Sequence, residues 1–442
     1  KYQEMIYSTD QKLCDDIYLD LTYSLTRLRV NGEYTFTWND ETYTVTMNDF
    51  SGRDKVNAGE VYTGVYFKLT KSIDLNDVEN FIIGTSETIS FAGHLDGNNC
   101  SIRGLNINNT TAAQVGLFDI VTSGNSISNL NVYGSVNGNS KVAGVVGYAS
   151  CEIVNCTNYV TVSGTGKYVG GVAGNVTTNS TGIIDCTNYG NVTSTSADGY
   201  VGGIVGSISA IVEGCSNYGN IVGTKYVGGV IGALYSSVNN CHNYGVITGE
   251  TRVAGVVGYA AGTISNCYNY GIINADSYIG GVSGYCKDGA AISNSYNYGT
   301  INGNKFYIGG IVGCSAYTIS NCENNGLIYG NDQVGGIVGQ LVGSVSNSEN
   351  YGAINGDNLH QVGGIVGTNG SSAMTVVNCQ NYGNITATNQ IGGIVGLIND
   401  TSSKIENSNN DNFIKKSIYI LKNKSFTSLL IWPHLLHVWL LG

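Results

Sequence analysis

The sequence has very little proline and little charge. Its 442 residues include 1 proline against 63 glycines, which excludes collagen, because a collagen helix needs abundant proline and a Gly-X-Y period. Only 12% of the residues are charged and 42% are hydrophobic, and the apolar ones are mostly Val and Ile set among Gly, Asn, Ser and Thr. This composition is typical of buried β-structure rather than of a disordered chain. The formal net charge of −11 repels phosphates and anionic lipid, so we expect no nucleic-acid partner.

The sequence also lacks a long hydrophobic run. No segment reaches the roughly 18 consecutive apolar residues of a membrane-spanning helix, so we expect no membrane span. The closest is the C-terminal stretch SLLIWPHLLHVWLLG, which fits a hydrophobic cap, a truncated anchor or an out-of-frame tail. Because Lys1 is not followed by a charged and then apolar leader, we expect either a removed signal peptide or a fragment of a longer product.

A glycine-rich unit recurs along most of the chain. Each copy starts with an apolar residue and a run such as V-G-G-V-I-G, and successive starts lie 26 to 32 residues apart. Self-similarity at such a period predicts a solenoid, a propeller or another repeat array. The copies start at Val142, Val169, Val201, Val227, Val253, Ile279, Ile308, Val334, Val362 and Ile391.

One copy, Tyr226 to Glu250, contains three short extended pieces joined by turn residues. It has no helical apolar period of the kind found in leucine-rich or ankyrin repeats, and it is shorter than the roughly 40 residues of a propeller blade. The sequence therefore predicts an all-β chain folded as a parallel β-helix, with about ten regular coils of 26–32 residues after irregular first coils.

Changes in composition divide the chain into four segments. Residues 1–48 lie outside the repeat and form either a cap or the end of a preceding domain, with a predicted strand from Ile17 to Leu25 and a predicted hairpin around Asn39 and Asp40. Residues 49–141 are predicted lead-in coils, 142–410 regular coils and 411–442 an atypical hydrophobic tail.

Seven cysteines share one position of the repeat, and stacked coils about 4.8 Å apart turn each such position into a column. Disulfides or a metal site are one interpretation. However, Leu130 and Ser295 fall in the same column, an odd number cannot pair completely, and no Cys-x-x-Cys spacing occurs. We therefore predict a structural column of small buried thiols, with no metal and no cofactor. Its cysteines are Cys156, Cys186, Cys215, Cys241, Cys267, Cys322 and Cys379.

The residue before each of these positions is usually asparagine. Amides in register can hydrogen-bond from coil to coil, so we predict a structural Asn ladder. Its clearest members are Asn240, Asn266, Asn294 and Asn321, and Asn155, Asp185, Gly214, Asn347, Asn378 and Asn407 share the column.

Two further columns are aromatic. A structural ladder of stacked rings is the main interpretation, whereas a column that faces solvent would offer flat rings to a sugar or a protein. The corner from Ala233 to Ser237 is a third candidate recognition feature. The first column comprises Tyr159, Tyr189, Tyr218, Tyr244, Tyr270, Tyr298, Tyr351 and Tyr382, interrupted by Asn325. The second comprises Tyr168, Tyr200, Tyr226, Tyr278 and Tyr307, with Arg252, Gln333, Gln361 and Gln390 in the same place.

Catalytic patterns are scarce. The sequence has no His-Glu-x-x-His motif, no nucleophile elbow and no phosphate-binding loop followed by a helix. Glu323 and Glu349 share a column one coil apart, which is a weak candidate for a carboxylate pair and fits two solvated turn residues better. We therefore predict that the chain is not an enzyme.

The lead-in VNAGEVYTGVYFKLTKSIDL, followed by FAGHLDGNNCSIRGLNI, VGLF and repeated VGGIVG with INC-x-NYG, resembles the GLUG-motif repeat proteins. The resemblance covers residues 49 to 399. That family includes bacterial surface adhesins and non-catalytic regions of immunoglobulin-A-cleaving metallopeptidases. The resemblance implies a right-handed parallel β-helix that is secreted or displayed on a cell surface, and it carries over no catalytic residue.

We therefore expect an extracellular or cell-surface, adhesin-like binding scaffold or stalk, with a host glycan or a host protein as its partner. Two alternatives stay open. One is a β-helix polysaccharide lyase or glycoside hydrolase, and the other is the non-catalytic repeat region of a larger secreted peptidase.

Overall fold

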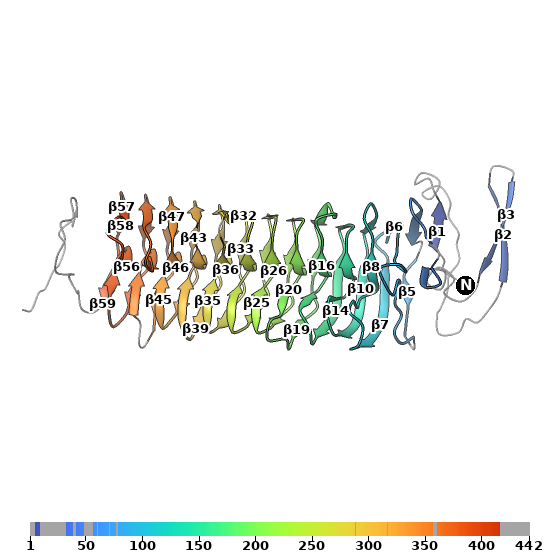
Figure 1. The fold of residues 1–442 in the computed structure, drawn as a ribbon, viewed down its shortest axis with the longest axis horizontal. Helices are drawn as coiled ribbons and strands as arrows, with labels where there is room; N and C mark the ends of the chain where they lie inside the picture. The colour runs from blue at the N-terminus through green and yellow to red at the C-terminus, as the bar shows by residue number, and fades with distance from the viewer. Residues whose placement is uncertain are drawn as a thin grey trace, which may run out of the picture.

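The computed structural model describes residues 5–8, 32–38, 41–47, 56–59, 61–69, 71–76, 78–287, 289–315, 317–356 and 360–415. Within these residues the chain forms an all-β solenoid of about 12 turns, in which parallel strands of successive turns lie side by side along one axis (Figure 1). The prediction of a parallel β-helix is confirmed. There are more turns than the ten predicted regular coils, because the lead-in coils pair in the same sheets as the regular ones.

A regular coil contributes five short strands to four sheets. In the fourth sheet each coil supplies two consecutive strands, and each strand pairs with the equivalent strand of the next coil. The hydrogen bonds between strands therefore run along the solenoid axis. The chain bends between the sheets. Val227, Val230 and Ile231 are all fully buried. In one straight strand, the neighbours Val230 and Ile231 would point to opposite faces. Both can point inward because the corner between the first and second sheets lies at Gly229 and Val230.

The four sheets run the length of the solenoid. The first sheet consists of β11 (Val142–Ala143), β15 (Tyr168–Gly170), β20 (Tyr200–Gly202), β25 (Lys225–Gly228), β30 (Thr251–Ala254), β35 (Ser277–Gly280), β40 (Phe306–Gly309), β45 (Asp332–Gly335), β50 (His360–Gly363) and β55 (Ile391–Gly392). The second consists of β8 (Phe118–Val121), β12 (Val146–Ala149), β16 (Ala173–Val176), β21 (Val205–Ile208), β26 (Ile231–Leu234), β31 (Val257–Ala260), β36 (Ser283–Cys286), β41 (Val312–Ser315), β46 (Val338–Leu341), β51 (Val366–Thr368) and β56 (Val395–Leu397). The third consists of β1 (Met5–Ser8), β4 (Tyr66–Leu69), β6 (His94–Asp96), β9 (Ser126–Ser128), β13 (Glu152–Val154), β17 (Gly182–Ile184), β22 (Ile211–Glu213), β27 (Ser237–Asn239), β32 (Thr263–Ser265), β37 (Ile292–Ser293), β42 (Thr318–Ser320), β47 (Gly343–Ser346), β52 (Met374–Val377) and β57 (Lys404–Glu406). The fourth begins with β5 (Ile73–Asp74), β7 (Ser101–Asn109), β10 (Asn131–Gly138) and β14 (Thr157–Gly164). It continues with β18 (Thr187–Asn188), β19 (Val192–Ser194), β23 (Ser216–Asn217), β24 (Ile221–Val222), β28 (His242–Asn243), β29 (Ile247–Thr248), β33 (Tyr268–Asn269), β34 (Ile273–Ala275), β38 (Tyr296–Asn297), β39 (Ile301–Gly303), β43 (Glu323–Asn324), β44 (Ile328–Tyr329), β48 (Glu349–Asn350), β49 (Ile354–Asn355), β53 (Gln380–Asn381), β54 (Ile385–Thr386), β58 (Asn409–Asn410) and β59 (Ile414–Lys415).

The two ends of the solenoid differ from its middle. β1 pairs antiparallel with β4 and covers the first edge of the third sheet. The predicted hairpin is confirmed, since β2 (Gly32–Trp38) pairs antiparallel with β3 (Glu41–Met47), whereas the predicted strand from Ile17 to Leu25 lies outside the described residues. At the other end, β59 extends the ladder to Lys415, beyond the predicted end of the regular coils at residue 410.

A buried Asn ladder runs through the interior. In nine consecutive coils the Asn at the N-Y-G position of the repeat donates through Nδ2 to Oδ1 of the Asn in the next coil, at 2.6–2.8 Å. The same Nδ2 also donates to the backbone carbonyl two residues ahead, as from Asn243 to Gly245 at 3.0 Å. Each amide therefore uses both of its donor hydrogens inside the protein. The ladder consists of Asn158, Asn188, Asn217, Asn243, Asn269, Asn297, Asn324, Asn350, Asn381 and Asn410.

This ladder explains the glycines that define the repeat. A Cβ on Gly255, the glycine of the V-A-G run, would lie 2.2 Å from Cγ of Asn269 and 2.4 Å from the carbonyl oxygen of Gly281. A Cβ on Gly299, the glycine of the next N-Y-G, would lie 2.7 Å from Nδ2 of Asn269. The amides thus lie between two glycine columns, and any larger side chain in either column would displace them.

Candidate functional site

The predicted Asn ladder exists, but it is built from a different column. Asn240, Asn266, Asn294 and Asn321 lie at the corner after the third sheet and adopt φ values of 53°, 52°, 47° and 53°. Asp185 and Gly214 in the same column also have positive φ, and these residue types tolerate the left-handed conformation best. The predicted residues are therefore corner residues, and the continuous buried ladder lies three residues later in each coil.

The cysteine column is structural, as predicted. Its thiols are free and buried, and Sγ of Cys215 donates to the carbonyl of Glu213 at 3.3 Å while it accepts from the backbone N–H of Cys186 at 3.4 Å. Ser295 makes the same two hydrogen bonds through its hydroxyl, with Ser293 and Cys267. This equivalence explains why Ser and Cys alternate in the column. Burial raises the pKa of Cys186, Cys215, Cys267, Cys322 and Cys379, for Cys267 to about 12, so these thiols stay protonated.

The first tyrosine column forms a continuous stack. Seven rings lie nearly parallel, with adjacent centroids 4.3–5.2 Å apart and planes within 11° of each other. The stack breaks at Asn325 and resumes with Tyr351 and Tyr382 at 4.8 Å. Arg103 lies over the first ring, with its Cζ atom 5.3 Å from the centroid of Tyr133. The seven rings are Tyr133, Tyr159, Tyr189, Tyr218, Tyr244, Tyr270 and Tyr298.

This geometry limits what the first column can bind. Tyr159 to Tyr298 are 38–46% exposed, but the face of each inner ring is covered by the next ring in the stack. What reaches solvent is therefore a row of ring edges. The column is a structural ladder in its geometry, and it does not offer the flat ring faces that a sugar would stack on.

The second tyrosine column is arranged differently. Tyr168, Tyr200 and Tyr226 stack in sequence, with interplanar angles of 10° and 9°, and then Arg252 takes the next place. From there on several ring pairs are oblique: Tyr226 meets Tyr259 at 83°, and Tyr278 meets Tyr307, its neighbour in the column, at 54°, whereas Tyr259 and Tyr285 stay nearly parallel at 10°. Oblique packing leaves parts of the ring faces uncovered, whereas in the parallel stack of the first column each inner ring face is covered by the next ring.

Arg252 lies at the centre of these rings. Its Cζ atom is 5.1 Å from the centroid of Tyr226, 5.4 Å from that of Tyr278 and 5.2 Å from that of Tyr285. Its Nε is buried without a hydrogen-bond partner, and Nη1 has only a long contact of 3.5 Å to the hydroxyl of Tyr226. Burial raises the pKa of Tyr259, and the nearby guanidinium partly offsets that rise. The sequence placed Arg252 in a tyrosine column but did not single it out.

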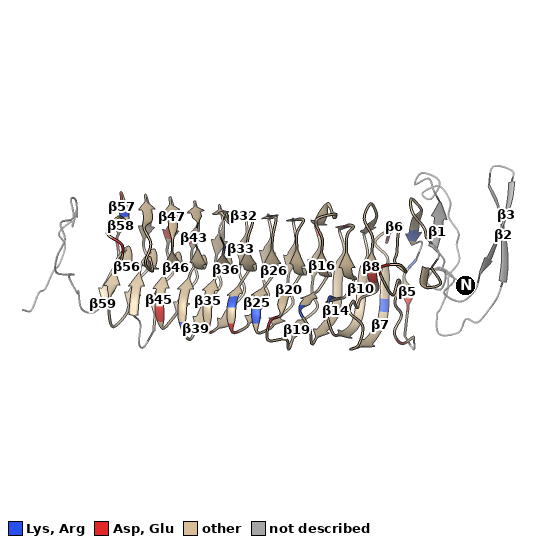
Figure 2. Ribbon diagram, in the orientation of Figure 1, with Lys and Arg blue, Asp and Glu red and all other residues tan. Residues whose placement is uncertain are grey.

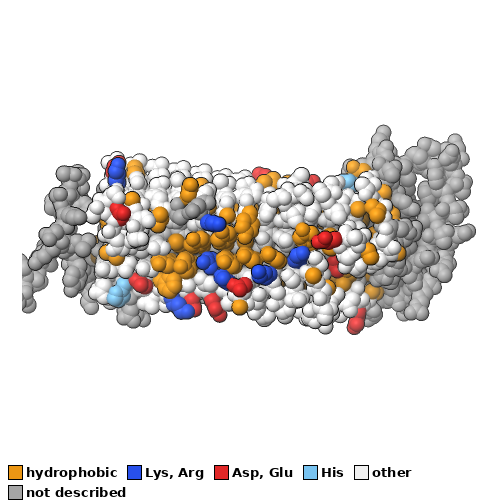
Figure 3. Space-filling view, viewed as in Figure 1, with side chains coloured by type: hydrophobic (Ala, Val, Ile, Leu, Met, Phe, Trp, Pro, Cys, Tyr) orange, Lys and Arg blue, Asp and Glu red, His pale blue; other side chains and the backbone are white. Residues whose placement is uncertain are grey.

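We define the Arg252 patch as Arg252 with Tyr226, Tyr259, Tyr278 and Tyr285, and its rim as Tyr235, Phe306 and Tyr307. Its rings come from the first and second sheets. Tyr235, in the predicted recognition corner, is 48% exposed, and its ring centroid lies 5.9 Å from that of Tyr259. Figure 3 shows hydrophobic side chains, tyrosines included, gathered over the part of this face that Figure 1 labels β25, β26, β35 and β36.

Charged residues are sparse along the solenoid (Figure 2). Two lysines near the patch are paired: Lys225 Nζ lies 2.7 Å from Asp198 Oδ1, and Lys305 Nζ lies 2.8 Å from Asp276 Oδ2. The hydrogen bond to Asp198 raises the pKa of Lys225. Within the described part of the chain, Arg252 has no carboxylate partner. It is therefore a cation held among aromatic rings without a counter-charge.

The two glutamates considered as a carboxylate pair are neighbours in the fourth sheet. Glu323 and Glu349 are in register on adjacent coils. Each is already engaged within its own coil: Glu323 Oε1 accepts from Asn325 Nδ2 at 2.6 Å, and Glu349 Oε2 accepts from the hydroxyl of Tyr351 at 2.7 Å. They lie on the outer face of a flat ladder. The expectation of turn residues is wrong, because the two glutamates lie in strands β43 and β48 and are half-buried.

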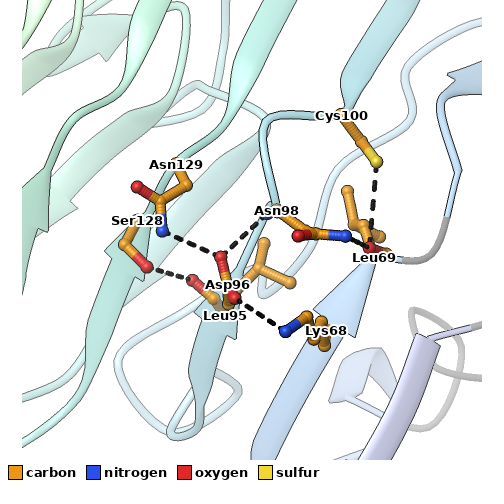
Figure 4. A network of polar contacts seen from close by, with 8 residues as sticks. All are labelled: Lys68, Leu69, Leu95, Asp96, Asn98, Cys100, Ser128 and Asn129. Carbon is orange, nitrogen blue, oxygen red and sulfur yellow. Dashed lines mark hydrogen bonds and ion pairs between the residues drawn. The ribbon is translucent and has the colours of Figure 1, made fainter. Parts of the chain in front are cut away.

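The most connected acidic residue in the lead-in coils is Asp96 (Figure 4). Its Oδ1 accepts from the backbone N–H of Asn98 at 2.8 Å and from Nδ2 of Asn129 at 2.9 Å, and its Oδ2 lies 3.7 Å from Nζ of Lys68. Asn129 in turn accepts from Nδ2 of Asn155 at 2.8 Å. Asp96 thus ties together three successive coils, which is a structural role.

The rest of the described surface offers little that could hold a ligand. No three His, Cys, Asp or Glu side chains come together among the described residues in a way that could hold a metal ion. No helix in that part of the chain has the length and apolar content to cross a membrane. A shallow polar depression lies beside β39, β44 and β49, lined by Asn302, Gly303, Asn304, Tyr329, Gly330, Asn355, Gly356 and Thr386.

No model of a known protein family matches the chain, and no curated protein sequence matches it. Among solved structures, the chain is similar to the crystal structure of a "putative immunoglobulin A1 protease" from Bacteroides ovatus. The two chains are 16% identical, the match covers 79% of this chain and 78% of the other, and the TM-score is 0.29. A similarity at this level carries no argument about function. The resemblance to GLUG-motif proteins therefore stays a prediction.

Proposed function

We propose that this chain is a non-catalytic binding scaffold, secreted or displayed on a cell surface, that holds its partner at the Arg252 patch. The observation that carries the proposal is the patch itself: half-buried rings, several of them packed obliquely and bordered by the exposed Tyr235 and Phe306, around a guanidinium that no carboxylate of the described residues neutralises. Exposed aromatic surface with an embedded cation is costly to leave in water, and such patches mark binding sites in soluble proteins.

The scaffold part of the proposal is supported by the solenoid. Each coil pairs mainly with its two neighbours, so the surface extends along one axis without a deep cleft, as in other repeat proteins that bind along their side. The Asn and Cys columns lie inside and hold the coils in register. Side chains on the outer face are thus free to vary from coil to coil without loss of the fold.

The state of the thiols is compatible with the extracellular part of the proposal. In an oxidising medium, exposed cysteines tend to form disulfides. Ten of the eleven described cysteines are buried, and burial raises the pKa of Cys286 and Cys314 to about 12. Because the thiolate is the reactive form, these residues resist oxidation without needing a reducing compartment.

The test is a glycan array and a panel of host surface proteins probed with the intact chain. Tyr259→Ala and Tyr278→Gln are the informative variants, because the fold already accepts both changes. Ala233 is in register with Tyr259 in the preceding coil, and Gln333 occupies the column of Tyr278 with a similar φ of 53°. We expect binding in the wild type and its loss in both variants.

The matched control is Tyr218→Asn in the first tyrosine column, because Asn325 already interrupts that column. This variant should bind as the wild type does. Loss of binding in the control but not in the patch variants would move the site to the stacked column. Release of new reducing ends from a polysaccharide by the wild-type chain would overturn the non-catalytic assignment and favour a lyase or hydrolase.

A further inference from the structure

We propose that the Arg252 patch binds the carboxylate of a single carboxylated sugar at the end of an otherwise neutral glycan. The inference rests on the proposed function and names its ligand class. It combines three observations: an unneutralised guanidinium, oblique rings around it, and the charge balance of the surrounding surface.

The guanidinium supplies the anion site. Nε of Arg252 is covered by the surrounding rings and makes no hydrogen bond, so an incoming group meets the terminal nitrogens Nη1 and Nη2. Nη1 has one long contact to the hydroxyl of Tyr226, which a stronger acceptor can replace. A carboxylate matches the two parallel N–H bonds of a guanidinium end, and such charge-assisted pairs are the strong ones.

The rings supply the sugar site. Tyr226 and Tyr259 meet nearly edge to face, and so do Tyr278 and Tyr285, at 83° and 68°. The patch therefore offers parts of ring faces, on which the C–H face of a pyranose can lie. A flat apolar partner would use the rings but not the guanidinium, and a simple anion would use the guanidinium but not the rings.

The charge balance limits the ligand to one carboxylate. The chain carries a formal net charge of −11, so a polyanionic chain is repelled as a whole. Near the patch, Lys225 and Lys305 are already neutralised by Asp198 and Asp276. Lys287, two residues after Tyr285, is exposed to solvent, whereas Arg252 is the cation enclosed by the rings. At physiological salt the attraction of such a charge is screened beyond about 8 Å, so it acts on a group bound at the patch itself.

Three matched probes test the proposal by titration against the intact chain: lactose, lactose extended by one N-acetylneuraminic acid, and the methyl ester of that trisaccharide. We expect the free acid to bind at least about tenfold more tightly than the ester, and the ester to bind about as weakly as lactose. Arg252→Gln should remove the preference for the free acid, so that the acid and the ester bind equally in the variant. Arg252→Lys should retain part of it, because it keeps the charge but not the paired donors.

The glutamine variant is expected to fold, since Gln333, Gln361 and Gln390 occupy the same column with φ values of 53°, 52° and 49°, close to the 56° of Arg252. Equal binding of acid and ester by the wild type would overturn the inference while leaving a neutral-glycan form of the proposed function standing. An unchanged acid preference in Arg252→Gln, or tighter binding of a peptide with a free terminal carboxylate, would also overturn it. No binding of any glycan or protein would overturn both proposals.

Discussion

The side chains of Asn243 and Asn269 are joined by a hydrogen bond of 2.8 Å from Nδ2 to Oδ1, and both residues are fully buried. The direction of this bond is determined by the backbone. Nδ2 of Asn243 also donates to the carbonyl of Gly245, which can only accept, so the amide cannot be reversed without losing both bonds. The ladder thus links each coil to the next with a defined polarity.

Asn243→Asp should destabilise the protein strongly. One carboxylate oxygen would keep the hydrogen bond from Nδ2 of Asn217, but the other would replace Nδ2 and face two acceptors, the carbonyl of Gly245 and Oδ1 of Asn269. We expect a loss of about 3–5 kcal/mol in the free energy of unfolding, measured by urea denaturation. Asn240→Gly is the control, because Gly214 already occupies that corner column, and it should change stability by less than about 1 kcal/mol. Equal effects of the two changes would contradict the assignment of the ladder.

Gly255→Ala should prevent the coil that contains it from forming. The added Cβ would lie 2.2 Å from Cγ of Asn269 and 2.4 Å from the carbonyl oxygen of Gly281, and neither neighbour can move without breaking the ladder. Overpacking costs about 1–3 kcal/mol in an adaptable core, and we expect more here. At Gly199 the nearest atom to an added Cβ is 3.1 Å away, on the side chain of Ser194, so Gly199→Ala should be tolerated. Thermal unfolding followed by circular dichroism compares the two.

Cys215→Ser should leave stability almost unchanged, within about 1 kcal/mol, because a hydroxyl can make both hydrogen bonds of the thiol, as Ser295 does. Cys215→Val keeps the volume but leaves the buried N–H of Cys186 without its acceptor, and should cost about 1–3 kcal/mol, whereas the carbonyl of Glu213 still accepts from the N–H of Asp185. Chemical denaturation measures both. In the folded wild type, the column thiols should also react with a maleimide only on unfolding.

Asp119 should make stability fall as the pH rises from 4 to 7. The carboxyl is buried and accepts a hydrogen bond from the N–H of Gly116, and burial raises its pKa from 3.8 to about 7. The folded state therefore holds the proton more tightly than the unfolded state, so the stabilisation is present at low pH and is lost as the pH passes 7. The loss attributable to this residue is up to about 4 kcal/mol.

The variant Asp119→Asn isolates that contribution, because an amide oxygen can still accept from Gly116 but does not titrate. The difference in unfolding free energy between variant and wild type should grow between pH 4 and pH 7 and then level off. A difference that is constant with pH would show that the carboxyl has an ordinary pKa in the folded protein.

The sequence predicted the fold and the inward cysteines because both follow from period and composition. It placed the Asn ladder in the wrong column because Asn240 and Asn243 recur at the same period. One signal was available: the Asn243 column is asparagine in all ten coils, whereas the Asn240 column also accepts Asp185 and Gly214, which points to a left-handed corner. Ring orientation could not be inferred, since it depends on side-chain rotamers rather than on spacing, and the Arg252 patch depends on that orientation.

The Asn ladder also gives the solenoid an electrical direction. Every amide from Asn158 onward points its N–H toward the next coil and its oxygen toward the previous one. The amide dipoles therefore add head to tail, as peptide dipoles do in an α-helix, with the positive end at Asn410. Whatever meets the last described coil, whether another coil or another molecule, encounters the positive end of this row of dipoles beside Asn410.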